Sequence, residues 1–290
     1  MPRPTWPFAL VFALLACDPL APPSAPRTPP AGRTVVRVVT WNAHDLFDSE
    51  DRLVAPGALD TVPVPAEVDA KLDRLAAVLL RLDADLVFLQ EVENPAVLDA
   101  LAARADYPEA RLVEGPDPRG IDVATLSRLP VEAYVSHAAD RDPAGAPLWP
   151  RDCVEVHVRI DGRRLVLAGT HASSRLSDDG TRRALQAARL RELADALRTA
   201  DPGALVLAGG DLNDPPEAPA IAPLAGDGAW LDPLPFAAYT WGEGQDAVQL
   251  DALLFARPDA AAVLAAWVAD GADVRRASDH LPVVLDLALY

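Results

Sequence analysis

Short apolar runs that end in a polar residue recur along this chain from residue 34 to its C-terminus. The runs are rich in valine or leucine and span roughly four to eight residues, which is typical of buried β-strands. A few segments between them carry apolar residues at helical spacing instead, most clearly residues 67–82. This mixture favours a fold in which β-sheets pack face to face and helices flank them.

The expected elements can be placed by residue number. We expect helices at 67–82, 95–105 and 181–199. We expect strands at 35–39, 86–89, 121–126, 131–135, 153–160, 165–168, 205–207, 249–255, 263–268 and 283–288. Within 153–160 apolar residues alternate with polar ones, so we expect one buried face there.

The charge balance restricts the partners of the chain. It has 26 basic and 43 acidic residues, a formal net charge of −17. Such a surface repels polyanions at long range, so strong non-specific binding of nucleic acid through counterion release is not expected. A hydrophobic fraction of 50% is sufficient for a substantial core.

The first seventeen residues predict export. Arg3 precedes an apolar stretch that is too short to span a bilayer, and the ending Leu-Leu-Ala-Cys at Cys17 resembles a bacterial lipoprotein signal. We therefore expect residues 1–17 to be a lipoprotein-type signal peptide that ends at the lipobox Cys17. Lipidation of Cys17 would leave an exported protein anchored to a membrane of the cell envelope. An ordinary secretory signal and a buried cysteine on a short helix are the alternatives.

The rest of the chain divides into a linker and one domain. Residues 18–33 contain six prolines and predict a semi-rigid tether, and residues 34–290 predict one continuous folded domain. Cys17 and Cys153 are the only cysteines, so lipidation of Cys17 would exclude an internal disulfide. We expect Cys153 to behave as a small buried hydrophobic residue.

Polar residues at the strand ends are the candidates for chemistry. Taken singly they have plainer explanations: Glu91 could be a solvated strand end, and Asp211 could cap a turn after two glycines. Asp251 lies within an apolar strand and needs a hydrogen-bond donor, because an unpaired buried charge costs several kcal/mol. The full set is Asn42, Glu91, Asp122, Arg151, His171, Asp211, Asn213, Asp251, Asp279 and His280.

Seven short motifs, in order, give these residues a common context. They are Trp41-Asn42, Gln90-Glu91, Gly120-Ile121-Asp122-Val123, Gly169-Thr170-His171, Gly210-Asp211-Leu212-Asn213-Asp214, Leu250-Asp251 and Ser278-Asp279-His280-Leu281-Pro282. Together they resemble the endonuclease/exonuclease/phosphatase superfamily, which has the deoxyribonuclease I-like fold. Two longer stretches, Leu46-Phe47-Asp48 and Gln90-Glu91-Val92-Glu93-Asn94, are similar to its bacterial secreted-nuclease-like branch.

The resemblance implies an α+β fold, namely a four-layer α/β/β/α sandwich of two packed mixed β-sheets flanked by helices. It also implies metal-dependent hydrolysis of phosphodiester bonds. Glu91 would be the main ligand of the metal, with Asn42 and Asp279 completing or supporting its surroundings. Oxygen ligands suit Mg²⁺, with Mn²⁺ or Ca²⁺ as alternatives, and the lack of a Cys/His cluster argues against zinc.

The remaining motif residues would act on the substrate. His280 would lie on the phosphate as a general base or a charged donor, oriented by Asp251. Asp211 and Asn213 would position the attacking water or the phosphate, and either Asp211 or His280 would take the proton. The resemblance makes three further assignments: His171 as phosphate donor or general acid, Arg151 as phosphate contact with a surface ion pair as its alternative, and Asp122 as a residue that orients a neighbour.

Two positions depart from the superfamily pattern. His44-Asp45 stands where relatives in this branch commonly have Glu-Asn, and Ala252 stands where many have His or Tyr. His137 and His157 match no motif, so we expect both to be surface or structural residues.

We expect an exported, lipid-anchored endonuclease that acts on DNA or RNA as a monomer. A sphingomyelinase-like or phosphomonoesterase activity on lipid headgroups or small phosphate esters is the alternative, and a catalytically silent surface-binding protein is the third. Against a nuclease, no run of basic residues is interleaved with aromatics, although Arg175, Arg182 and Arg183 follow His171.

Overall fold

The computed structural model describes residues 34–50 and 62–289. The predicted signal peptide with Cys17 and the proline-rich tether lie outside the described residues, as do residues 51–61 and Tyr290. In the part that is described, no helix is both long and apolar enough to cross a membrane.

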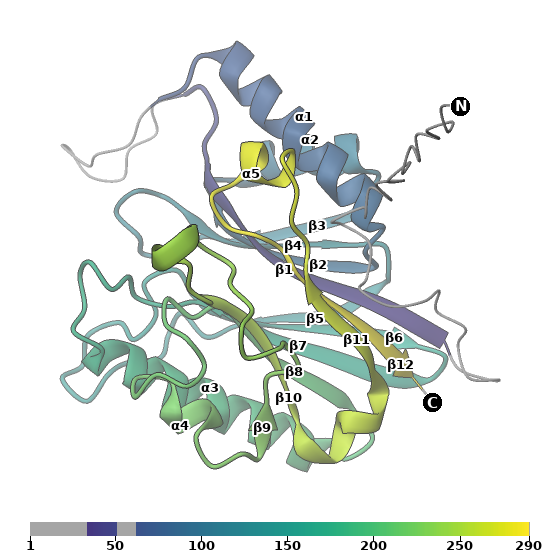
Figure 1. Cartoon of the computed structure of the whole chain (residues 1–290), viewed down its shortest axis with the longest axis vertical. Helices are drawn as coiled ribbons and strands as arrows, with labels where there is room; N and C mark the ends of the chain where they lie inside the picture. Colours follow the sequence, from purple (N-terminus) through teal and green to yellow (C-terminus); the bar gives the residue numbers. More distant parts are fainter. Residues whose placement is uncertain (1–33, 51–61, 290) are drawn as a thin grey trace, which may run out of the picture.

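Two six-stranded sheets make up the centre of the fold (Figure 1). The first has the order β11-β12-β1-β2-β4-β3 and the second β5-β6-β7-β8-β10-β9. Both are mixed, because β1 pairs with β2 and β7 with β8 in parallel while the other pairings are antiparallel. The strands are β1 (Thr34–Leu46), β2 (Leu86–Val92), β3 (Glu109–Val113), β4 (Asp122–Ser127), β5 (Val131–Ser136), β6 (Cys153–Ile160), β7 (Arg163–His171), β8 (Leu205–Asp211), β9 (Trp230–Leu231), β10 (Asp251–Ala256), β11 (Val263–Val268) and β12 (Val283–Leu289).

Helices cover the outer face of each sheet, which gives the four layers that the resemblance implies (Figure 1). The first sheet packs on α1 and α2 through a cluster that includes Leu75 and Leu98. The second packs on α3 and α4 through Leu190 and Leu224. The helices are α1 (Pro65–Leu82), α2 (Pro95–Ala105), α3 (Thr181–Ala200), α4 (Ala222–Ala225) and α5 (Val274–Ala277), with 3₁₀ turns η1 (Gly244–Asp246) and η2 (Arg257–Ala262).

A third apolar cluster lies between the sheets and sets how closely they approach. Phe88 of β2 packs there against residues of the opposite sheet such as Leu167. A Cβ at Gly169 would come within 2.5 Å of the Phe88 ring, so only glycine allows this contact. Gly210 has φ +123, and a Cβ there would lie 2.1 Å from the Thr170 carbonyl. These two glycines let the ends of β7 and β8 pack closely beside β2.

The expected helices and strands are present, with two omissions and one correction. β3 and β9 were not predicted, because Glu109 and Arg111 interrupt the first and the second has only two residues. The expectation of a single buried face on 153–160 is wrong. Cys153 and Glu155 on the second face are also buried, and the α3 residues Ala187 and Leu190 share a cluster with Cys153. Cys153 is fully buried as expected.

Strand register brings the motif residues to one edge of the sandwich. In the second sheet Asp211 is paired with His171 on one side and with Asp251 on the other. In the first sheet Asn42 is paired with Gln90, one residue before Glu91. Residues far apart in sequence therefore meet where the two sheets end together.

Candidate active site

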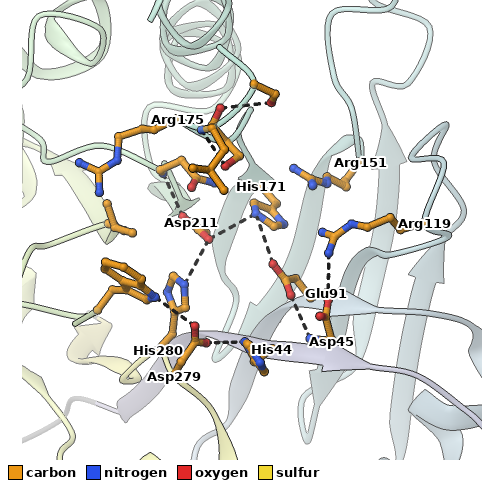
Figure 2. Close-up of a pocket in the computed structure, with 16 residues that line it drawn as sticks. His44, Asp45, Glu91, Arg119, Arg151, His171, Arg175, Asp211, Asp279 and His280 are labelled. Atoms are coloured by element: carbon orange, nitrogen blue, oxygen red, sulfur yellow. Dashed lines mark hydrogen bonds and ion pairs between the residues drawn. The ribbon is translucent and has the colours of Figure 1, made fainter. Parts of the chain in front are cut away.

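A cavity of about 520 Å³ opens at this edge of the sandwich (Figure 2). Glu91, from the first sheet, faces His171 and Asp211 from the second, and His280 reaches in from the turn before β12 (Figure 2). The lining residues are His44, Asp45, Glu91, Arg119, Arg151, His171, Ser174, Arg175, Leu176, Ser177, Asp211, Asn213, Trp241, Leu250, Asp279 and His280.

Asp211 lies at the centre of the cavity floor. Its Oδ2 is 3.3 Å from His171 Nε2 and 3.9 Å from His280 Nε2, and it accepts a hydrogen bond from Asn42 Nδ2 at 3.0 Å. Burial and the nearby Asp251 carboxylate raise the pKa of Asp211 to about 7. A carboxylate with this pKa can accept a proton near neutral pH.

His280 is held by Asp251, as the resemblance implies. Its Nδ1 lies 2.7 Å from Asp251 Oδ2, and both side chains are buried. Burial opposes the charged imidazole, but the carboxylates of Asp251 and Asp211 outweigh it and raise the pKa of His280 to about 10. His280 is therefore an imidazolium at neutral pH, and its Nε2 points toward Asp211.

His171 has the opposite character. Burial and the positive charge of Arg151 hold its pKa well below the usual range, so the ring is neutral. Its Nε2 faces Asp211 and Glu91, while its buried Nδ1 has no hydrogen-bond partner among the described residues. Two histidines of different charge thus lie on either side of one carboxylate.

Glu91 reaches the cavity from a strained backbone. Its φ is +60, in the left-handed region that residues other than glycine seldom adopt. Oε1 accepts from Asn42 Nδ2 at 3.2 Å, and Oε2 accepts from the backbone N–H of Asp45 at 2.9 Å. Burial would raise the pKa of Glu91, but the hydrogen bonds from Asn42 and from the Asp45 backbone lower it to about 2. The side chain is therefore ionised at neutral pH.

These acidic groups fit a hard divalent cation. Burial chiefly, together with the charge of the adjacent Glu91 carboxylate, raises the pKa of Asp45 to about 6, so the two carboxylates repel each other. A cation beside Glu91 would relieve this repulsion, and oxygen donors are what Mg²⁺ prefers. Asn42 supports the carboxylates of Glu91 and Asp211 through Nδ2, while its Oδ1 accepts the His44 N–H at 2.8 Å.

A second group could also hold a metal ion. Ligand atoms of Asp211, Asp251 and His280 lie within 4.8 Å of one another, and all three residues are buried. In this structure, however, the charged His280 already neutralises part of that acidic group. Among the described residues, the imidazole nearest to Glu91 is that of His171, which is neutral and lies 4.0 Å away, so Glu91 is the better centre for a metal.

Asp279 lines the cavity, and both of its carboxylate oxygens have side-chain partners. Its Oδ1 is 2.7 Å from His44 Nδ1, and its Oδ2 accepts a hydrogen bond from Trp241 Nε1 at 3.0 Å. His44, which departs from the superfamily pattern, is thus paired with the carboxylate assigned to the metal. Both side chains are about half exposed, at 50% and 43%.

Arg151 reaches the cavity as expected and is also ion-paired. Its Nε lies 2.6 Å from the buried Asp117 carboxylate, and Nη1 donates to the Ala172 carbonyl at 3.3 Å. Arg119 lies beside it, bonded through Nη1 to Asp45 at 3.1 Å. The phosphate-contact and ion-pair interpretations of Arg151 are therefore compatible.

The structure also places the two remaining candidates. Asn213 lines the cavity, donates to the Ala172 carbonyl through Nδ2 at 3.1 Å, and its N–H bonds Asp211 Oδ1 at 2.9 Å. Asp122 is buried outside the lining and accepts the Gly115 N–H at 2.6 Å, next to the Arg151 backbone. Burial raises the pKa of Asp122 to about 7. Its position suits orientation of a neighbour rather than contact with substrate.

Sequence reasoning missed several residues that line the cavity. His44 and Asp45 were noted only as departures from a pattern, although their position two and three residues after Asn42 was a usable signal. Arg119 and Trp241 carried no signal in a single sequence. His137 and His157 lie outside the cavity, where both bond Glu155, at 2.8 and 2.9 Å. They are structural residues, as expected.

Comparison with known proteins agrees with this fold. Residues 39–280 match the model of the Endonuclease/Exonuclease/phosphatase family. No curated protein sequence matches the chain. Several solved structures are similar, at identities that show the fold alone.

Three of these similar structures are proteins of different kinds. TDP2 of D. rerio complexed with a single-strand DNA product has a TM-score of 0.60 and 20% identity, covering 87% of this chain and 98% of that chain. The human Nocturnin catalytic domain with a bound sulfate anion has a TM-score of 0.61 and 17% identity, covering 88% and 96%. Sphingomyelinase C from Streptomyces griseocarneus has a TM-score of 0.57 and 18% identity, covering 88% and 99%.

Proposed function

The chain belongs to the endonuclease/exonuclease/phosphatase family, and from this premise we propose that it is a metal-dependent phosphodiesterase, specifically an endonuclease. The observation that supports this most strongly is the position of Asp211 between two imidazoles of different charge, 3.3 Å from His171 and 3.9 Å from His280. A proton acceptor, a neutral donor and a charged donor thus line one cavity of about 520 Å³.

Hydrolysis of a phosphodiester requires a deprotonated water in line with the leaving oxygen and positive charge on the phosphoryl oxygens. Asp211 takes the proton of the water, since its pKa of about 7 keeps it basic enough. His280, kept charged by Asp251, donates from Nε2 to a phosphoryl oxygen. The pKa values favour this assignment of the two roles over its reverse.

The remaining side chains bind and orient the phosphate. His171 donates to a phosphoryl or leaving oxygen, and Arg151 contributes a fixed positive charge from the buried pair with Asp117. Glu91, supported by Asn42, would hold the divalent ion, which when bound supplies further positive charge to a phosphoryl oxygen. Mg²⁺ suits these oxygen donors, with Mn²⁺ or Ca²⁺ as alternatives.

The choice of an endonuclease rests on the positive side chains at the cavity, Arg119, Arg151 and Arg175. They concentrate cationic groups at one place on a chain of net charge −17. The structural likeness to a protein crystallised with a single-strand DNA product is consistent with it. A sphingomyelinase-like activity is the second candidate, because a sphingomyelinase shares the fold and the sequence predicts a lipid anchor.

We further propose that the protein is exported and held on a membrane by lipid at Cys17, and that it acts as a monomer. The proposed export and lipid anchor rest on the sequence of residues 1–17. Replacing Cys17→Ser should release the protein from the membrane fraction while leaving phosphodiesterase activity in the soluble fraction. Membrane attachment that persisted in this variant would refute lipidation as its cause.

A substrate panel tests the proposed function. The full-length protein would be assayed with Mg²⁺, Mn²⁺ or Ca²⁺ on plasmid DNA, RNA, sphingomyelin vesicles, bis(p-nitrophenyl) phosphate and p-nitrophenyl phosphate. We expect turnover of the bis-aryl phosphodiester and of nucleic acid. No turnover of any substrate with any of the three ions would favour a silent binding protein instead.

A matched pair of histidine variants tests the site. We expect His280→Ala to lose nearly all activity with its circular dichroism spectrum unchanged. His157→Ala, which removes a partly buried imidazole outside the cavity, is the control and should keep most of the activity. If His280→Ala stayed within tenfold of the parent, the assignment of the site would be wrong.

A further inference from the structure

The loop between β7 and α3 overhangs the cavity. It follows His171 directly, and Ser174, Arg175, Leu176 and Ser177 all line the cavity. Hydrogen bonds from the backbone N–H groups of Leu176 and Ser177 to Ser174 form a tight turn. Leu176 at its tip is 99% exposed.

Buried polar side chains of α3 hold this loop in place. Arg183 is 4% exposed and pairs with Asp178 at 3.1 Å and with Asp214 at 2.7 Å. It also donates to the Ser173 carbonyl, while Gln186 accepts the Ser173 N–H at 3.0 Å. Asp214 belongs to the motif that contains Asp211, so the loop is tied to the catalytic strand end. The Ser174–Ser177 turn is therefore held at its base by the hydrogen bonds of Ser173 and by the ion pairs of Arg183.

Of the three arginines that follow His171, only Arg175 faces the cavity. Arg182 donates to the carbonyls of Pro147 and Leu148, and Arg183 is occupied by its two carboxylates. Within the described residues no carboxylate forms an ion pair with Arg175, which is exposed. An exposed guanidinium at the edge of the cavity is available to bind an anionic group of a ligand.

The positive groups flank the catalytic centre on two sides. Figure 2 shows Arg175 on one side of Asp211 and His171, and Arg119 and Arg151 on the other. Trp241 and Leu250 contribute aromatic and aliphatic surface to the same cavity. Trp241 is held by its hydrogen bond to Asp279. An occupant with one phosphate at the centre, a further phosphate nearby and a flat apolar group between them would match this lining.

We propose that Arg175 binds the phosphate next to the scissile one in a single-stranded oligonucleotide, with the intervening base lying against Trp241. This rests on the proposed function and goes beyond it, because it assigns substrate selection to the Ser174–Ser177 turn. Arg119 provides the matching contact on the other side of the scissile phosphate. Stacking of a base on an aromatic ring is a sequence-tolerant contact, so the site selects strand length and charge rather than base sequence.

Substrate length separates this role from a contact with the scissile phosphate. The full-length parent and Arg175→Gln would be assayed on bis(p-nitrophenyl) phosphate, on a dinucleoside monophosphate (the dinucleotide with a single phosphate) and on a single-stranded octanucleotide. We expect kcat/KM of the variant to fall about tenfold on the octanucleotide, as for one charged hydrogen bond. That loss should exceed the loss on either single-phosphate substrate at least fivefold. Arg159→Gln, an exposed strand arginine paired with Glu132, is the control for the change in net charge.

Salt dependence gives a second readout. The plot of log kcat/KM against log salt concentration for the octanucleotide should become shallower by about 0.7 in Arg175→Gln, the value for one phosphate contact on a single strand. The Arg159→Gln slope should equal that of the parent. Equal losses of Arg175→Gln on all three substrates, or an unchanged slope, would overturn the proposal.

The remaining outcomes distinguish this inference from the function it rests on. Turnover of the bis-aryl phosphodiester by the parent, without preference for the octanucleotide over the dinucleotide, would overturn the role of Arg175 alone. Parent and Arg175→Gln would also be compared on sphingomyelin vesicles. A loss confined to these vesicles would likewise overturn the proposed role of Arg175 and would indicate a lipid headgroup as its ligand. If the parent turned over none of these substrates, the proposed function would fail and the inference with it.

Discussion

The positive charge of His280 depends on the neighbouring Asp251 carboxylate, and removing that carboxylate charge should change both the titration of His280 and the activity. Asp251→Asn keeps the shape of the side chain and an oxygen that can accept from His280 Nδ1, but it removes the negative charge. Both side chains are buried, with His280 8% and Asp251 0% exposed. Solvent therefore does little to screen the change.

Two estimates give its size. Raising the pKa of His280 from 6.5 to about 10 corresponds to a preference for the charged form of about 5 kcal/mol. A Coulomb attraction across 2.7 Å, with an effective dielectric constant of about 20, is about 6 kcal/mol. Burial opposes the charged imidazole, and among the groups that raise the pKa of His280, Asp251 contributes most and Asp211 next. We expect the pKa of His280 to fall to about 7 or below in Asp251→Asn.

The assay combines a titration with kinetics. NMR of ¹⁵N-labelled imidazole groups would follow the protonation of His280 in parent and variant, with His280→Gln identifying the resonance. At pH 8 we expect kcat/KM of Asp251→Asn on bis(p-nitrophenyl) phosphate to be about 10³-fold below the parent. At pH 6 the ratio of parent to variant should shrink, because His280 of the variant regains its proton. Asp286→Asn, another buried strand carboxylate paired with Arg37, is the control.

The outcome that refutes this reasoning is clear. If His280 of Asp251→Asn still titrated near 10, Asp251 would not be the source of its charge. If the ratio of parent to variant were the same at pH 6 and pH 8, the charge would not matter to catalysis. Either result would remove the argument for Asp211, rather than His280, as the base.

Three further predictions concern the surroundings of the site. Arg183→Met leaves the carboxylates of Asp178 and Asp214 without their buried partner, so it should lower the free energy of unfolding by about 3 kcal/mol in urea denaturation. A loss below about 1 kcal/mol would contradict the buried pairing. Lys71 Nζ donates at 2.6 Å to the Ala277 carbonyl and so positions the Ser278-Asp279-His280 motif that follows. Lys71→Met should therefore reduce kcat several-fold and Lys71→Arg should restore it. No change in kcat would exclude this positioning role. Hydrogen bonds from two histidines outweigh burial and lower the pKa of Glu155 to about 2, below the value of 4.5 in the unfolded chain. The ionised Glu155 therefore stabilises the fold above pH 4.5, and this stabilisation is lost as the pH falls toward 2. Between pH 4.5 and pH 2 the free energy of unfolding should therefore fall less in Glu155→Gln than in the parent. Equal falls of the two proteins in acid denaturation would contradict this role of Glu155.

Much of the fold is predictable because the strand signal here is local. Runs such as 283–288 contain enough valine and leucine to predict a buried strand without knowledge of its partners. β3 escaped prediction because Glu109 and Arg111 interrupt its apolar residues, so its place in the sheet comes from pairing with β4. The second buried face of β6 escaped because α3, some thirty residues later, covers it.

The residues of the candidate site can likewise be separated into those that local sequence predicts and those that depend on tertiary structure. Residues that lie within motifs, such as Asp211 and His280, could be predicted to share a cavity. Residues whose role depends on an unrelated loop could not. Nothing local distinguishes Arg119 from an ordinary surface arginine, and the sequence could not separate Arg175, which lines the cavity, from Arg182 and Arg183, which do not. Asp279 shows the limit of transferring roles by motif alone, since its partner His44 departs from the superfamily pattern.

Metal dependence tests the central claim most directly. The full-length protein would be treated with EDTA, dialysed and assayed on bis(p-nitrophenyl) phosphate while Mg²⁺ is added back, in parallel with Glu91→Gln. We expect activity to vanish on chelation, to return in a saturable way, and to need at least about tenfold more metal in Glu91→Gln. Undiminished hydrolysis after chelation, or the same metal requirement in Glu91→Gln as in the parent, would contradict a metal-dependent phosphodiesterase centred on Glu91.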